Sequence, residues 1–258
     1  MLKRATIDDF KAIEDFCDRD ICGIKSLCQI KAYGFERDFL EIWCMKNEEE
    51  INTVVTRFYD DITITSCDKT DFEQLEVFLD MFYWKTVMCT EQLCKKLQFK
   101  NYTVKNGYKY FTQSSDFCAD VLTEEDFSSA YSLISKEIPG SFKDEREAYL
   151  SFLSDYTFRE RRGMARGFCT HTDKKLSSVA ITSAETEKNA IISGVACDGT
   201  LRKKGLGKNT VHAIAESLVN DGKRPFVIAL NESAEGFYEH IGFEFFERIA
   251  FVERKNDV

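Results

Sequence analysis

The chain has 258 residues, 43% of them hydrophobic, which excludes a disordered protein and leaves room for one large domain or two small ones. Its formal net charge of −9 at pH 7, with no segment that concentrates enough lysine and arginine to overcome it, argues against a nucleic-acid partner. No apolar stretch approaches the ~20 residues needed to cross a bilayer, and residues 1–9 lack the apolar core of a secretion signal. We therefore expect a cytoplasmic protein with no membrane partner.

Ten cysteines are a conspicuous feature of the composition. None of them forms a Cys-x-x-Cys pair, and the three histidines lie far along the chain from the cysteine clusters at residues 17–28 and 89–94. Zinc sites use tighter spacings than these. We therefore expect free, buried thiols and no metal site.

Elements of the first half return in the second half. Residues 1–13 read as a short strand followed by a helix with a Thr/Asp cap. Two later segments of the first half, a strand and a longer strand–helix segment, also resemble segments of the second half. The matched pairs are residues 1–13 with 120–127, residues 62–68 with 191–198, and residues 84–99 with 226–243. We predict a domain-scale internal repeat.

The boundary between the halves is predicted near Thr112–Ser115, the most polar uncharged stretch between them. This gives a first domain of residues 1–113 and a second of residues 114–258. Three strand-like runs open the second domain and are joined by short turns, which predicts an antiparallel meander. The runs are Arg166–Thr172, Leu176–Ala184 and Ala190–Cys197.

A glycine-containing turn follows the third of these strands. Gly205 and Gly207 lack Cβ atoms, so the backbone can turn sharply and approach a ligand closely. Apolar residues at helical spacing follow as far as Val219, and Gly222 stands where a helix C-cap is expected. The N–H groups at a helix start favour an anion, so the ligand should carry phosphate. Basic residues surround the turn: Arg202, Lys203, Lys204 and Lys208.

Two common phosphate motifs do not fit this turn. A Walker loop needs Gly at its first position and Ser or Thr at its last, where the chain has Arg202 and Asn209. A dinucleotide fingerprint needs a third small residue and an acid that ends the next strand, where the chain has Thr210 and Asn231.

The turn resembles the pyrophosphate loop of the GNAT acyltransferases, Arg/Gln-x-x-Gly-x-Gly/Ala. After a buried strand at residues 225–230, the segment Asn231–Phe243 also resembles the GNAT pattern Asn-x-x-Ala-x-x-x-Tyr-x-x-x-Gly-Phe, with every named position filled. The resemblance covers roughly residues 116–252. It implies an α+β fold of two GNAT-like domains, each a mixed, mostly antiparallel sheet flanked by helices.

The resemblance also implies a cofactor and roles for particular residues. Acetyl-coenzyme A would be the cosubstrate. Tyr238 fills the position that protonates the leaving thiolate, and Asn231 the position that contacts the pantetheine arm. Backbone groups of Val195, Ala196 and Cys197 would pair with the pantetheine amides. The diphosphate would be bound by Arg202, Lys203, Lys204, Gly205, Leu206, Gly207 and Lys208.

The general base is left open by the sequence. Many family members place a glutamate in the strand that bears the cofactor slot, where this chain has Ile192-Ser193-Gly194. A water relay, Glu137, Glu185 and His171 remain as alternatives. The acceptor is open as well: Phe142, Tyr149, Phe152 and Tyr156 form either an aromatic wall of its site or helix core.

The first half lacks the cofactor loop. Its corresponding turn, Asp68–Asp71, has no glycine and places acid where a diphosphate would lie. At the position of Tyr238 it offers Leu93, Cys94 or Lys95, depending on register. We therefore expect a degenerate first domain that binds no coenzyme A.

Two functions follow from these expectations. The first is an N-acetyltransferase that passes the acetyl group to the amine of a small molecule or peptide by direct attack. The alternative is a regulatory module that binds coenzyme A or acyl-coenzyme A without turnover. The oligomeric state is not readable from the sequence.

Overall fold

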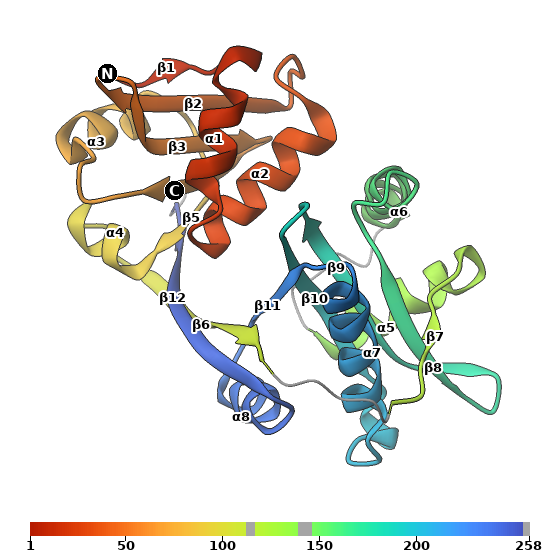
Figure 1. Cartoon of the computed structure of the whole chain (residues 1–258). Helices are drawn as coiled ribbons and strands as arrows, with labels where there is room; N and C mark the ends of the chain where they lie inside the picture. Colours follow the sequence, from red (N-terminus) through yellow and green to blue (C-terminus); the bar gives the residue numbers. More distant parts are fainter. Residues whose placement is uncertain (112–116, 139–145, 255–258) are drawn as a thin grey trace. The chain divides into compact units, whose positions relative to one another are not determined.

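The computed structural model describes residues 1–111, 117–138 and 146–254, and these divide into two compact units (Figure 1). Unit 1 comprises Met1–Tyr108, Ala229–Glu235 and Phe245–Val258. Unit 2 comprises Lys109–Ile228 and Gly236–Glu244. The helix α8 (Glu232–His240) contributes residues to both.

Unit 1 is a mixed sheet with helices on both faces (Figure 1). Its strands lie in the order β1-β2-β3-β4-β5-β12-β6. Neighbours from β1 to β4 are antiparallel, β4 and β5 are parallel, and β5 and β12 are antiparallel. The elements are β1 (Lys3–Arg4), α1 (Phe10–Cys17), α2 (Ile21–Tyr33), β2 (Leu40–Asn47), β3 (Glu50–Phe58), β4 (Asp61–Ser66), α3 (Phe72–Asp80), β5 (Thr86–Thr90), α4 (Glu91–Lys96), β6 (Tyr102–Tyr110) and β12 (Phe243–Glu253).

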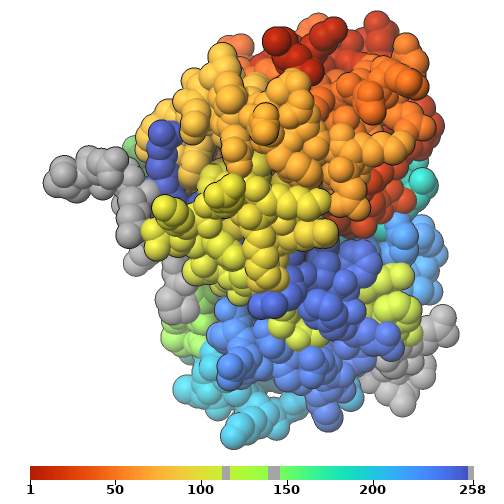
Figure 2. Space-filling model, turned by 90° about the vertical axis from the view of Figure 1, so that its left-hand side faces the viewer, coloured from red at the N-terminus to blue at the C-terminus, as the bar shows by residue number. Residues whose placement is uncertain are grey.

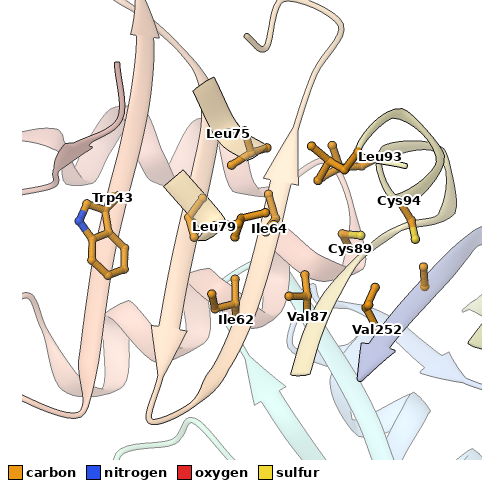
Figure 3. Packing of buried hydrophobic residues seen from close by; sticks show 13 residues of the cluster. Trp43, Ile62, Ile64, Leu75, Leu79, Val87, Cys89, Leu93, Cys94 and Val252 are labelled. Atoms are coloured by element: carbon orange, nitrogen blue, oxygen red, sulfur yellow. The ribbon is translucent and has the colours of Figure 1, made fainter. Parts of the chain in front are cut away.

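Successive residues of this sheet face opposite sides, as a pleated strand requires. Ile42 and Val54 pack in a cluster with α1 and α2, whereas their neighbours Trp43 and Val55 pack in a second cluster with α3 and α4. Figure 3 shows this second cluster, in which Leu75 of α3 lies over the sheet. Figure 2 looks onto α3 and α4, which form the outer surface of unit 1 on that side.

Unit 2 repeats this plan around a sheet of order β11-β10-β9-β8-β7, in which only the β10–β11 pair is parallel among the described strands. Val179 of β9 packs with α5 and α6, while its neighbour Ser178 accepts a hydrogen bond from Thr210 of α7, so α7 covers the other face. The elements are β7 (Asp120–Val121), α5 (Phe127–Glu137), α6 (Arg146–Glu160), β8 (Gly167–Thr172), β9 (Lys175–Glu185), β10 (Asn189–Cys197), α7 (Leu206–Asn220) and β11 (Arg224–Ile228).

Both units begin in the same way, as the internal repeat predicted. A two-residue strand leads into a single 3-10 turn, Ile7–Asp9 in unit 1 and Glu124–Asp126 in unit 2. In each turn a threonine and an aspartate three residues later cap one another: Thr6 with Asp9, and Thr123 with Asp126.

The units are not contiguous in sequence. Most of β12 belongs to unit 1, where residues 249–253 pair with β5. The contacts therefore group the C-terminal segment with the first half, whereas the expected domain 114–258 kept it with the second. The predicted boundary at residues 112–115 lies outside the described residues.

All ten cysteines are free thiols, and seven are buried. None of the described helices is both long enough and apolar enough to span a membrane.

Strand β12 brings a carboxylate to the start of α2. Ile21 N donates to Glu247 Oε1 at 2.6 Å, and Gly23 N donates to Asp20 Oδ1 at 2.6 Å. Burial, reinforced by the charge of Asp20, raises the pKa of Glu247 to about 8. Burial also raises the pKa of Asp20 to about 6. The folded protein therefore retains protons that the unfolded chain has lost.

The raised pKa of Glu247 makes unit 1 less stable at alkaline pH. A folded-state pKa above the unfolded value contributes stability that is fully present below the unfolded pKa and lost as pH rises through about 8. We expect Glu247→Gln to have little effect at pH 5 and to raise the unfolding free energy by about 1–3 kcal/mol at pH 9. Glu253→Gln, at an exposed position of the same strand, is the control. Urea titrations at both pH values measure this; an equal effect of Glu247→Gln at pH 5 and pH 9 would contradict it.

Candidate functional site

Strand β10 is interrupted by a bulge at Gly194. The register between β9 and β10 shifts between Ser193 and Ala196, and Gly194 has φ +54°. A Cβ there would lie 2.9 Å from Ile181 Cγ1 and 3.0 Å from Ile134 Cδ1, so both backbone conformation and packing require glycine. The described ladder between β10 and β11 runs only from Asn189 to Ile192. The peptide groups of Val195–Cys197 therefore lie beyond its end.

The turn after β10 leads directly into α7. Gly205 has φ +83° and is the N-cap residue of this helix, and its carbonyl accepts the first helical hydrogen bond from Asn209 N. A glycine N-cap has no side chain to accept from the first-turn N–H groups. These groups and the positive end of the helix dipole favour an anion at this point.

Gly207 lies in the first turn of α7, close to Cys197 and Phe237. An added Cβ would lie 3.9 Å from both Cys197 Cβ and Phe237 Cζ, which is ordinary contact. Gly207 N–H approaches the Cys197 thiol, yet burial is the larger effect and raises the thiol pKa. A thiol with a raised pKa is a poor nucleophile, so Cys197 packs beside the turn.

Of the basic residues of the turn, one forms an ion pair within unit 2 and three are exposed to solvent. Arg202 Nη2 lies 2.5 Å from Glu137 Oε2, at the end of α5, and Glu137 Oε1 accepts a hydrogen bond from Gly199 N. Arg202 is therefore held by α5 in this structure. Lys203, Lys204 and Lys208 are exposed around Gly205.

The corresponding turn of unit 1 supplies its own anion. Asp71 is the N-cap residue of α3, and its carboxylate accepts from Gln74 N at 3.1 Å. The preceding Thr70 is buried and donates to Asn52 O at 2.8 Å. The β3–β4 ladder also runs from Thr53 to Phe58 without a register shift. Unit 1 thus has neither the bulge nor the uncapped helix start of unit 2.

Tyr238 lies in α8, buried at 7% exposure against the rings of Phe237 and Phe243. Burial raises its pKa, so the hydroxyl remains protonated at neutral pH. Asn231 belongs to unit 1, where its Oδ1 accepts from Ala234 N at 3.0 Å and caps α8.

The repeat fixes which residue of unit 1 corresponds to Tyr238. Gln98 (φ +50°) in the turn after α4 has the left-handed conformation of Gly242 (φ +95°) after α8. Aligning these two residues places Cys94 at the position of Tyr238. Cys94 is fully buried and offers no hydroxyl proton.

The three candidate bases all have partners. Glu137 is bound by Arg202 and Gly199 N, as described. Glu185 is 1% exposed and pairs with Arg166 at 3.0 Å and Lys223 at 2.6 Å. His171 Nε2 lies 2.9 Å from Asp126 Oδ1. Sequence reasoning gave no sign of these pairs, because the partners lie far apart along the chain.

The proposed aromatic wall is partly core. Tyr156 is 1% exposed, and Phe152 packs against the same cluster. Tyr149 contacts the ring of Tyr131 with centroids 5.1 Å apart. Phe142 lies outside the described residues. The helix-core alternative therefore holds for Tyr156 and Phe152.

The sequence analysis missed the role of Gly194. An isolated glycine within an apolar strand often marks a bulge, and this signal was available in Ser193-Gly194-Val195.

The two glycines of the turn should respond differently to alanine. Because Gly205 has φ +83°, Gly205→Ala should lower the unfolding free energy by about 1–2 kcal/mol. Gly207→Ala meets only ordinary contacts and should be neutral or stabilising by up to ~1 kcal/mol. Urea unfolding of both variants measures the difference; equal losses would show that the left-handed conformation at Gly205 is not the constraint.

Comparisons with known proteins support the fold. Residues 167–252 match the family model described as FR47-like protein. A comparison with curated proteins gave no match.

The solved structures that are similar to nearly the whole chain include the following three. An acetyltransferase of the GNAT family from Colwellia psychrerythraea has a TM-score of 0.64 at 12% identity and covers 99% of this chain and 100% of its own. A tandem GNAT protein from the clavulanic acid biosynthesis pathway has a TM-score of 0.62 at 10% identity and covers 100% of this chain and 99% of its own. A Drosophila protein has a TM-score of 0.66 at 11% identity, covering 98% of each chain. The GNAT resemblance predicted from the turn is thus confirmed, and the chain has the GNAT fold in its tandem arrangement.

Proposed function

We propose that unit 2 binds acetyl-coenzyme A at the first turn of α7 and transfers the acetyl group to the amine of a small molecule or peptide. The observation that carries this proposal is the contrast between two helix starts. Asp71 places a carboxylate at the start of α3, whereas Gly205 leaves the start of α7 without a side-chain acceptor. A diphosphate supplies the missing acceptor atoms, and Lys203, Lys204 and Lys208 add positive charge.

The bulge in β10 supports the same assignment. Beyond Ile192 the strand is released from its ladder with β11, so the peptide groups of Val195–Cys197 can pair with the amides of the pantetheine arm. Backbone N–H groups at such a bulge can also polarise the thioester carbonyl as negative charge develops on its oxygen.

The chemistry is a direct acyl transfer. The amine nitrogen attacks the thioester carbon, the C–N bond forms, and the C–S bond breaks. Tyr238, kept protonated by its raised pKa, donates its proton to the departing sulfur and regains a proton from water afterwards. The amine proton leaves through water, because Glu137, Glu185 and His171 are each engaged by other groups.

Because these three candidate bases are engaged by other groups, a second candidate function is also favoured: a module that binds coenzyme A without turnover. Release of free coenzyme A thiol from acetyl-coenzyme A across a panel of amines separates the two functions. Thiol release that depends on an amine supports the enzyme, and binding without release supports the module.

Cofactor binding should require Gly207 and occur once per chain. We expect Gly207→Leu to abolish binding of coenzyme A in calorimetry, because the side chain would enter the space between Cys197 and Phe237. Lys69→Ala, in the corresponding turn of unit 1, is the matched control and should leave affinity and a stoichiometry of one unchanged. Circular dichroism checks the fold of both variants. Unchanged affinity in Gly207→Leu, or two sites per chain, would contradict the assignment.

Tyr238→Phe removes one oxygen from a buried ring and leaves the packing in place. If Tyr238 protonates the leaving thiolate, turnover should fall by about 10²–10⁴ with little change in cofactor affinity. Tyr131→Phe, which changes a buried tyrosine of α5, is the control. Steady-state kinetics and calorimetry measure the two quantities. A loss of less than about threefold would assign Tyr238 to the core alone.

A further inference from the structure

The capped turn that opens each unit faces the second strand of that unit. In unit 1, Asp9 Oδ1 accepts from Lys46 Nζ at 2.6 Å. Lys46 stands two residues after the buried Cys44 on β2, and Cys44 is paired with Lys3 of β1. The carboxylate of this turn is therefore neutralised by an ammonium group of the chain itself.

Unit 2 has the same backbone arrangement. Asp126 occupies the place of Asp9, and the register of β7 and β8 pairs Asp120 with Cys169. His171 follows Cys169 by two residues, as Lys46 follows Cys44. The register shift in β2 between Met45 and Lys46 also recurs in β8 between Thr170 and His171. The two sets of residues are thus structurally equivalent.

The side chains of unit 2 form a cluster with metal-ligand chemistry. One ligand atom each of Asp126, Cys169 and His171 lies within 4.8 Å of the other two. His171 Nε2 is 2.9 Å from Asp126 Oδ1, and His171 Nδ1 is 3.8 Å from Asp120 Oδ2. The remaining oxygen of Asp126 accepts from Thr123 N and Oγ1 at 3.2 and 2.9 Å.

The exchange of residues between the units reverses the local charge. In unit 1 the Asp9 carboxylate pairs with the ammonium group of Lys46, and Lys3 stands opposite Cys44 in the strand register. Unit 2 places an imidazole between the two carboxylates of Asp126 and Asp120. A dication at this point would take the role that Lys46 has in unit 1.

We propose that Asp126, Cys169 and His171 bind a zinc-type divalent metal ion. A thiolate, an imidazole and a carboxylate form a donor set that Zn²⁺ accepts, with a water as fourth ligand. Thr123 holds the Asp126 carboxylate, and Asp120 faces the second nitrogen of His171, as outer partners of metal ligands do. Binding would release the thiol proton of Cys169 to solvent and tie the start of α5 to β8.

The sequence analysis expected no metal because no Cys-x-x-Cys pair occurs and the histidines lie far from the two cysteine clusters of the first half. The proposed ligands are Cys169 and His171 on one strand, with Asp126 more than forty residues earlier. None of the proposed ligands is among the residues assigned to the first turn of α7, and the metal ion does not enter the proposed acyl transfer.

Cobalt(II) tests the site because a bound thiolate gives it a charge-transfer absorption band. Titration of the full chain carrying Cys118→Ser, which removes the exposed thiol, should show one cobalt per chain with that band. Zn²⁺ should displace the cobalt. Cys169→Ser should abolish the band, and Cys44→Ser, at the equivalent position of unit 1, should retain it. His171→Lys introduces the residue of unit 1 and should weaken cobalt binding at least tenfold.

Two outcomes would overturn the proposal. One is the absence of a thiolate band at stoichiometric cobalt in the protein with the intact cluster. The other is a band that persists in Cys169→Ser or His171→Lys. His171→Lys retains a cation for Asp126, so circular dichroism should show an intact fold, and this variant decides the matter if Cys169→Ser does not fold.

Discussion

The first turn of a helix has N–H groups that the helix itself cannot satisfy, and something else must provide the acceptor. This constraint separates the two halves of the molecule. In α3 the acceptor is the carboxylate of Asp71, which belongs to the chain. In α7 the N-cap residue is Gly205, which has no side chain to offer. One fold therefore contains a helix start that is complete by itself and another that suits an external anion.

The rest of unit 2 follows from the position of that helix start. Gly194 forms a bulge in the pairing of β10 with β9, and the described ladder of β10 with β11 stops at Ile192. Beyond that point the strand offers its backbone where the ligand of α7 would extend. Glu137 joins the end of α5 to the turn through Gly199 and Arg202. A displacement of α5 would therefore move the turn through these contacts. If Glu137 moved to another partner, Arg202 would lose this ion pair.

The sequence was sufficient for features encoded by neighbouring residues. The caps at Thr6 and Thr123, the strand before Cys197 and the glycine turn all have local signals, and each was predicted. The pairing of β12 with β5 was not, because the apolar alternation of a strand does not state which strand will be its neighbour. The ion pair of Glu137 with Arg202 was missed for the same reason, since its partners meet only after folding. The match of Tyr238 with Cys94 of unit 1 depends on the left-handed conformation of Gln98. The sequence does not reveal this conformation, because glutamine has no preference for it.

The pairing of β12 with β5 also governs the order in which the protein can be assembled during synthesis. Residues 86–90 leave the ribosome before the β7–β11 segment of unit 2, whereas their partners at 249–253 leave after it. Until then β5 has an unpaired edge, which is a site for mispairing with other chains. All of unit 2's β7–β11 segment is made in this interval. Unit 1 is thus begun before unit 2 and completed after it, and a nascent chain that stops before residue 249 lacks the strand that closes this edge.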